Sequence, residues 1–172
     1  MTVGTQWSGD GFTADDQSGA SPDKTCTPAT GSTITPTCST TGCTPALTGE
    51  FSGTVAPCTD YAGFAMLGWN VAATATGTWS IPATGGVTIT FTNTNSAATV
   101  RFQVQDATGD QWCAPLTSGV EIPWSSLKTK CWGTAGTALT AGTAIQQAMV
   151  EVVGNATTAV PYDICVQSVA IQ

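Results

Sequence analysis

The chain has 172 residues, a formal net charge of −7 and no histidine, and only 9% of its residues are charged. So acidic a surface disfavours nucleic acid as a partner, and no apolar run reaches the roughly 20 residues that a membrane-spanning helix needs. The lack of histidine excludes the Ser-His-Asp and Cys-His catalytic arrangements. The length suffices for one domain with a hydrophobic core, and the frequent threonine, glycine and proline residues favour strands and turns over helices.

The first 46 residues differ in composition from the rest. They are rich in threonine, proline and cysteine and show little regular apolar alternation. We predict an extended N-terminal arm over residues 1–46, stapled by disulfides to a β-sandwich domain over residues 47–172. The alternative is a solvated linker from a longer secreted protein.

Strand signals recur at regular spacing from residue 47 onward. Apolar and polar residues alternate in several segments, which places every second side chain on one face of a strand. The 144–154 segment is compatible with a strand or a short helix, and its valines and the Gly154-Asn155 stop favour a strand. The sequence predicts an all-β fold, a two-sheet β-sandwich of the jelly-roll type with roughly eight or nine strands and little or no helix. The expected strands lie in segments 50–56, 64–73, 76–81, 86–93, 100–105, 120–127, 144–154 and 162–172.

Seven cysteines in a threonine-rich, lysine-poor chain indicate an oxidising environment, so we predict a secreted, extracellular protein. Zinc is disfavoured because histidine and CxxC pairs are absent. We expect Cys113 to pair with Cys131, because the short excursion between them is easily closed by a disulfide. Cys165 is expected to pair with Cys58 or with one of the N-terminal cysteines. The odd number leaves at least one thiol, which stays free or links to another chain.

Several short motifs resemble a known family. They are YAGFAMLGWN at 61–70, VRFQVQ at 100–105 followed by Trp-Cys-Ala, IPWSSLKTKCW at 122–132, and YDICVQSVAI at 162–171. Residues from about 47 to the end resemble the galactose-binding-like β-jelly-roll carbohydrate-binding modules of bacterial secreted glycoside hydrolases. The resemblance implies a sandwich that binds a β-glycan on a concave sheet or on edge loops, with a structural calcium near the chain ends.

Carbohydrate recognition needs planar polar groups for the sugar hydroxyls and aromatic platforms for the apolar faces of the rings. In the 100–105 segment every second residue is polar, so three polar side chains share one face, and residues of two further strands join them if those strands lie in the same sheet. The predicted polar contacts are Arg101, Gln103, Gln105, Asn70, Gln147 and Glu151, and the predicted platforms are the loop tryptophans Trp79, Trp112 and Trp132. The alternatives are an ordinary solvated sheet face and tryptophans that only pack on the core or on a disulfide.

Carboxylates are few, and none stands in a recognisable catalytic pair, so we expect no enzyme activity. Oxygen ligands for the structural calcium are predicted at Asp10, Asp15, Asp16 and Asp163, and the alternative is an acidic N-terminal turn. No other cofactor is expected.

The leading functional prediction is a non-catalytic, secreted module that binds a polysaccharide. One alternative is a self-assembling extracellular fibre or surface subunit, joined through the N-terminal arm or an unpaired cysteine. A weaker alternative is an ice-binding protein that uses threonine rows, formed by Thr74, Thr76 and Thr78 and by Thr88, Thr90 and Thr92.

Overall fold

The computed structural model describes residues 7, 9, 11–15, 49–55, 63–93, 98–155 and 157–172, and of residues 13–15 and 49–54 it describes the backbone alone. This part of the chain contains ten strands and a single three-residue 3-10 helix, so the predicted all-β fold is confirmed. The 144–154 segment is a strand, as its valine content indicates. Within the described ranges, no helix is long and apolar enough to cross a membrane.

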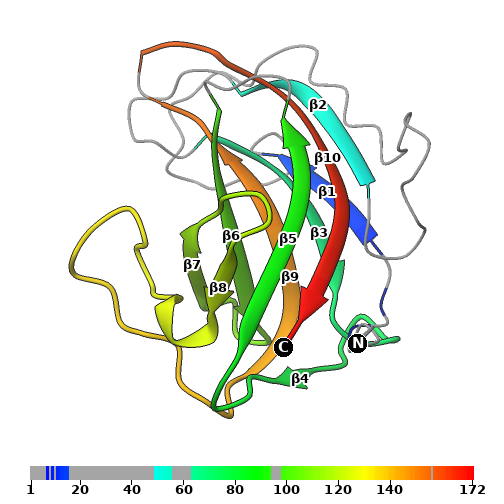
Figure 1. Cartoon of the computed structure of the whole chain (residues 1–172), viewed down its shortest axis with the longest axis vertical. Coiled ribbons are helices and arrows are strands. Elements are labelled where there is room, and N and C mark those ends of the chain that lie inside the picture. Colours follow the sequence, from blue (N-terminus) through cyan, green and yellow to red (C-terminus); the bar gives the residue numbers. More distant parts are fainter. Residues whose placement is uncertain are drawn as a thin grey trace.

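The strands form two antiparallel sheets that face each other, with β5 and β10 in front of β6 and β9 in Figure 1. Sheet A has, in order, β1 (Gly11–Asp15), β3 (Phe64–Asn70), β9 (Ala144–Val153), β6 (Thr99–Asp106) and β7 (Gln111–Pro115), and the short β4 (Trp79–Ser80) also pairs with β9. Sheet B has, in order, β2 (Gly49–Val55), β10 (Val160–Ile171), β5 (Gly86–Asn93) and β8 (Glu121–Pro123). The 3-10 helix η1 (Trp124–Ser126) follows β8 directly.

From β2 to β10, leaving out the short β4, the first strand pairs with the last, the second with the next to last, and so on inward, as in one long hairpin. β2 pairs with β10, β3 with β9, β5 with β8, and β6 with β7. The chain therefore switches between the two sheets at most connections. This nested order of eight strands is a jelly roll, and β1 extends sheet A beyond β3.

The inner faces of the two sheets carry the apolar residues whose alternation is visible in the sequence. Phe102 on β6 is fully buried, and Tyr162, Ile164 and Val166 on β10 point into the same core, as predicted. A register shift between Val166 and Ser168 marks a bulge, which changes the residues of β10 that face the core beyond that point.

The sequence does not predict two of the strands, β1 and β7. Trp7 is buried in the core and β1 pairs with β3, so these parts of the 1–46 segment belong to the sandwich, whereas most of that segment lies outside the described residues. β7 has only five residues and ends in a proline, which leaves too short a pattern for alternation to be recognised.

One of the two predicted threonine rows lies on no strand. Residues 71–76, which include Thr74 and Thr76, form bends and a turn, and Thr78 lies in the irregular segment before β4. Thr88, Thr90 and Thr92 do lie on β5.

The predicted disulfide between Cys113 and Cys131 is confirmed, with a Cα–Cα distance of 5.3 Å. Cys165 is buried on β10, and its predicted partners, Cys58 and the N-terminal cysteines, lie outside the described residues. A disulfide of this kind is typical of proteins that fold in an oxidising compartment.

Candidate functional site

The outer face of sheet A carries most of the residues predicted as ligand contacts, and the strand register arranges them in rows. Asn70 of β3 lies opposite Gln147 of β9, and Gln147 lies opposite Gln105 of β6. Gln111 of β7 lies opposite Gln105 and continues the row. We call these four residues the amide row. Three of them are predicted from the sequence, and Gln111 is not, because its strand is not.

The amide row is hydrogen-bonded within itself and accessible to solvent. Nε2 of Gln147 donates to Oδ1 of Asn70 at 3.3 Å, and Nε2 of Gln111 donates to Oε1 of Gln105 at 3.0 Å. Gln111 is exposed and the other three residues are partly exposed. Each amide has more donor and acceptor positions than these two bonds use. The row therefore offers fixed amide groups across four strands that are spaced about 4.8 Å apart, over a length of about 14 Å.

Arg101 and Glu151 form an ion pair on the same face, four residues along β6 from Gln105. The two residues are direct cross-strand partners on β6 and β9. Nε and Nη2 of Arg101 donate to the two carboxylate oxygens of Glu151, each at 2.8 Å. The side chain of Glu151 is 4% exposed and that of Arg101 is 15% exposed. The structure thus brings these two predicted contacts together, but they bind each other and leave few groups for a ligand.

The outer face is closed between the amide row and the ion pair. Gln103 is only 5% exposed, and its cross-strand partner Met149 is also buried. Phe12 of β1 lies against Gly68 of β3, where a Cβ atom would come within 2.4 Å of its ring. Gln103 therefore shares the face of Arg101 and Gln105, as predicted, but it is not exposed there.

Trp132 is the most exposed large hydrophobic residue of the described ranges, at 71%. It lies in a turn over residues 130–133, in which the backbone N–H of Gly133 donates to the carbonyl of Lys130 at 2.9 Å. We call residues 130–133 the Trp132 turn. The buried side chains of Leu127 and Leu139 anchor the two ends of the segment that carries it, and the backbones of these two leucines are hydrogen-bonded.

Three contacts of different kinds hold the Trp132 turn against sheet A. The Cys113–Cys131 disulfide links it to β7. Nζ of Lys128 donates to the carbonyl of Gly133 at 2.8 Å. The guanidinium of Arg101 lies 5.2 Å from the centroid of the Trp132 ring, within the range of a cation–π contact. The indole is therefore held in place on one side while most of its surface remains in water.

The other two predicted platforms pack on the core and are not loop tryptophans. Trp79 begins β4 and contacts Trp7 and Trp124, with ring centroids 6.0 Å and 5.4 Å apart. Trp112 lies within β7 opposite Val104 and packs against the core. Of the three predicted platforms, only Trp132 is exposed, whereas Trp79 and Trp112 are partly buried.

Of the predicted calcium ligands, the structure describes the backbone of Asp15 and the whole of Asp163. Asp15 ends β1 in sheet A, whereas Asp163 lies on β10 in sheet B. Asp10 and Asp16 lie outside the described residues. Those ranges hold no group of three or more His, Cys, Asp or Glu residues that could bind a metal ion. Calcium stays a prediction.

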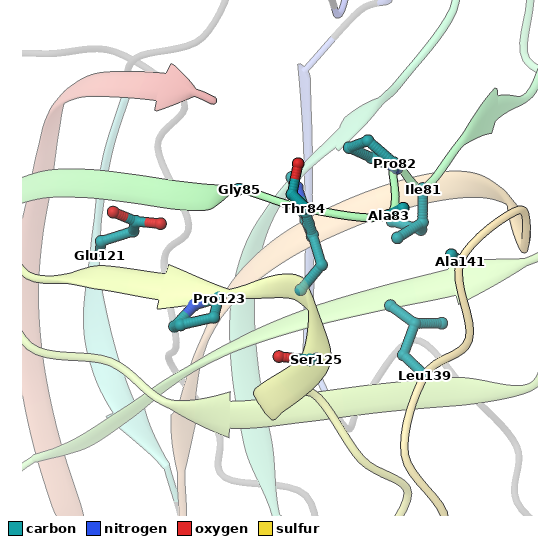
Figure 2. Close-up of a pocket in the computed structure, with 11 residues that line it drawn as sticks. Ile81, Pro82, Ala83, Thr84, Gly85, Glu121, Pro123, Ser125, Leu139 and Ala141 are labelled. Atoms are coloured by element: carbon teal, nitrogen blue, oxygen red, sulfur yellow. The ribbon is translucent and has the colours of Figure 1, made fainter.

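A pocket of about 310 Å³ opens beside β8, and none of the predicted site residues lines it. Figure 2 shows Glu121 and Pro123 on one side of this pocket and Ile81 and Leu139 on the other. Its exposed polar side chains are the hydroxyls of Thr84 and Ser125 and the carboxylate of Glu121. Because the pocket mixes one carboxylate with apolar side chains, it is a competing binding site that experiments must separate from the amide row.

The turn between β6 and β7 holds Gln105 and Gln111 in register. Oδ1 of Asp106 accepts hydrogen bonds from the hydroxyl of Thr108 at 2.8 Å and from the backbone N–H groups of Thr108 at 2.9 Å and Asp110 at 3.0 Å. Partial burial raises the pKa of Asp106, but these hydrogen bonds lower it by more, so its pKa lies below the usual value.

The outer face of sheet A thus carries two accessible features, the amide row and the Trp132 turn, on either side of a closed centre. Both depend on strand pairings and on a disulfide that bring together residues far apart in the sequence. No protein-family model matches this chain, and no curated protein or solved structure shows significant similarity to it.

Proposed function

We propose that this chain is a non-catalytic, secreted carbohydrate-binding protein and that a polysaccharide lies across the amide row. The observation that carries the proposal is the alignment of Asn70, Gln147, Gln105 and Gln111 across four neighbouring strands. A neutral glycan has many hydroxyl groups, each of which donates and accepts. Side-chain amides also donate and accept, so the two surfaces can satisfy each other without a charge on either side.

The geometry of the amide row favours an extended ligand. Its length of about 14 Å follows from the strand spacing and exceeds that of a single sugar ring. The two internal hydrogen bonds restrain the side chains before binding, which lowers the conformational entropy that a ligand must immobilise.

Catalysis has little support from the same residues. Glycoside hydrolysis uses two carboxyl groups placed on either side of the scissile bond. Glu151 is the carboxylate of β9 and lies four residues from Gln147 of the amide row. It is buried in the ion pair with Arg101. Asp106 lies next to Gln105, but its carboxylate accepts hydrogen bonds from its own turn. We therefore propose the amides, and not these two carboxylates, as the working groups of this surface.

A glycan-array screen followed by isothermal titration tests the proposal. We expect Gln105→Ala and Gln147→Ala each to weaken binding of the selected glycan about 5- to 150-fold, because each removes hydrogen bonds at roughly 1–3 kcal/mol. The matched control is Gln167→Ala, since Gln167 is an exposed glutamine on β10 of the other sheet. That control is expected to bind like the parent protein.

A second variant separates the amide row from the pocket beside β8. Ser125→Trp places a large side chain at that pocket, which Ser125 lines, and is expected to leave binding unchanged. Loss of binding in Ser125→Trp, with parent-like binding in both glutamine variants, would assign the ligand to the pocket. Absence of any glycan from the screen would contradict the proposed function as a whole.

A further inference from the structure

Among the described residues of this acidic protein, the positive charges gather around one exposed aromatic ring. The described residues contain three basic side chains, Arg101, Lys128 and Lys130, whereas the whole chain has a net charge of −7. Lys130 lies within the Trp132 turn, Lys128 bonds to its last residue, and Arg101 lies under the indole of Trp132. These three charges are therefore clustered at one turn and are not spread evenly over the sandwich.

Two of these three charges have no opposite charge beside them. Arg101 is neutralised by the bidentate contact with Glu151. Among the described residues, neither Lys128 nor Lys130 forms an ion pair. The turn therefore presents two ammonium groups next to Trp132, on a protein whose remaining surface repels anions.

The turn is built in a conformation that displays Lys130. Its φ angle is 54°, and it is the only residue other than glycine with a positive φ in the described ranges. Such a backbone costs energy for a lysine and persists only where the surroundings determine it. Here the disulfide at Cys131 and the hydrogen bond from Gly133 to Lys130 close the turn.

A shallow hollow of about 120 Å³ lies next to the indole. Its lining is largely apolar and includes Thr99, Pro115, Val153, Trp132 and Arg101. The site thus combines an aromatic surface and a small apolar hollow with two cations, Lys130 within the turn and Lys128 just before it. Neutral sugars would use the first two of these features, and only an anionic ligand would use all three.

We propose that the Trp132 turn binds a carboxylated sugar unit of an acidic polysaccharide, that is, a uronic acid residue. The apolar face of the sugar ring lies on Trp132, and its carboxylate pairs with the ammonium of Lys130, with Lys128 contributing to the local potential. This inference rests on the proposed carbohydrate binding and adds a ligand class that the amide row alone does not select. It also accounts for the clustering of these basic side chains. The acidic remainder of the surface repels an anionic polymer, so such a polymer binds only at this turn.

The test compares two polymers with the same sugar backbone, one with charged carboxylates and one in which they are methyl esters. Isothermal titration with polygalacturonate and with its fully methyl-esterified form keeps the backbone constant and removes the carboxylates. We expect the parent protein to bind polygalacturonate at least about 10-fold more tightly at low salt, and we expect this preference to shrink above about 0.5 M salt because screening acts on exposed charges.

Substitutions at the turn assign the site. We expect Lys130→Gln to weaken polygalacturonate binding about 3- to 10-fold and Lys130→Arg to retain it, since only the second keeps the charge. Trp132→Ala is expected to weaken binding about 10-fold or more, whereas Trp132→Phe, which keeps an aromatic surface, should lose less. Thermal melts of each variant check that the fold is intact.

The outcomes distinguish this inference from the proposed function. Binding of a neutral glycan that Gln105→Ala weakens, without a preference for polygalacturonate, would overturn the inference and leave the proposed function standing. A preference for polygalacturonate that survives in Lys130→Gln and Trp132→Ala would also overturn it, because the polymer would then bind elsewhere. Equal binding of double-stranded DNA and polygalacturonate would show that charge alone is recognised and would refute the choice of ligand. No binding of either polymer or of any arrayed glycan would contradict both proposals.

Discussion

Removing the charge of Glu151 should destabilise the sandwich more than any substitution of an exposed carboxylate. The change Glu151→Gln keeps the size of the side chain but leaves the Arg101 guanidinium, whose side chain is 15% exposed, without its counter-charge. Breaking a buried pair in this way costs roughly 3–5 kcal/mol. We expect about 3 kcal/mol, at the lower end of this range, because Arg101 keeps some solvent contact and keeps its contact with Trp132.

Chemical denaturation gives the free energy of unfolding, and calorimetry should show Tm falling by about 6–12 °C. The matched control is Glu121→Gln, because Glu121 is an exposed glutamate on a strand, and its effect should stay within about 0.5 kcal/mol. The double variant Arg101→Met with Glu151→Leu should recover most of the lost stability, since apolar replacement of a whole buried pair is often neutral. A change below about 0.5 kcal/mol for Glu151→Gln would refute the reasoning, because the pair would then contribute no more than a surface contact.

Three further predictions address the core, the disulfide and the β6–β7 turn. Phe102→Ala should lower the free energy of unfolding by roughly 3–5 kcal/mol through a cavity in the fully buried core, and a loss below 1 kcal/mol would contradict this packing. Replacing both Cys113 and Cys131 by serine should cost about 2–4 kcal/mol in denaturant titrations, and unchanged stability would show that the bridge constrains little. The lowered pKa of Asp106 stabilises the fold above about pH 4, and this contribution is lost as pH falls through the lowered value. Asp106→Asn should therefore show a shallower loss of stability on acidification, and parallel curves for the two proteins would rule this out.

The fold could be predicted from the sequence where strands are long and buried on one side. The 86–93, 100–105 and 144–154 segments alternate over enough residues for the period of two to be visible, and all three are strands. β1 and β7 have five residues each, and their contacts across the sheet determine them more than their own pattern.

The candidate site could be predicted only in part. The alternation of side chains along a strand shows which face a residue is on, but not which residues of other strands lie beside it. Asn70, Gln147 and Gln105 meet as expected, since each lies on the polar face of its strand. The pairing of Arg101 with Glu151 joins residues 50 positions apart and depends on β6 lying beside β9. The sequence predicts Arg101 as a ligand contact, whereas the ion pair gives it a structural role.

The exposure of the tryptophans likewise depends on contacts between distant residues and could not be predicted from the sequence. Trp79, Trp112 and Trp132 all look like loop or edge residues in the sequence, each beside small or polar neighbours. Only the folded chain shows that two of them pack on the core, while the disulfide folds the third back over Arg101.

The nested strand order has a consequence for how the protein is made. β10, the last strand of the chain, lies between β2 and β5 in the middle of sheet B. Val55 of β2 pairs with Val160 of β10, about a hundred residues later, so the partner of β2 does not exist when β2 leaves the ribosome. Until β10 is synthesised, β2 and β5 present unpaired edges of the kind that chaperones protect from aggregation. The β6–β7 hairpin is local and can form first, so sheet A can begin to assemble before β10 completes sheet B.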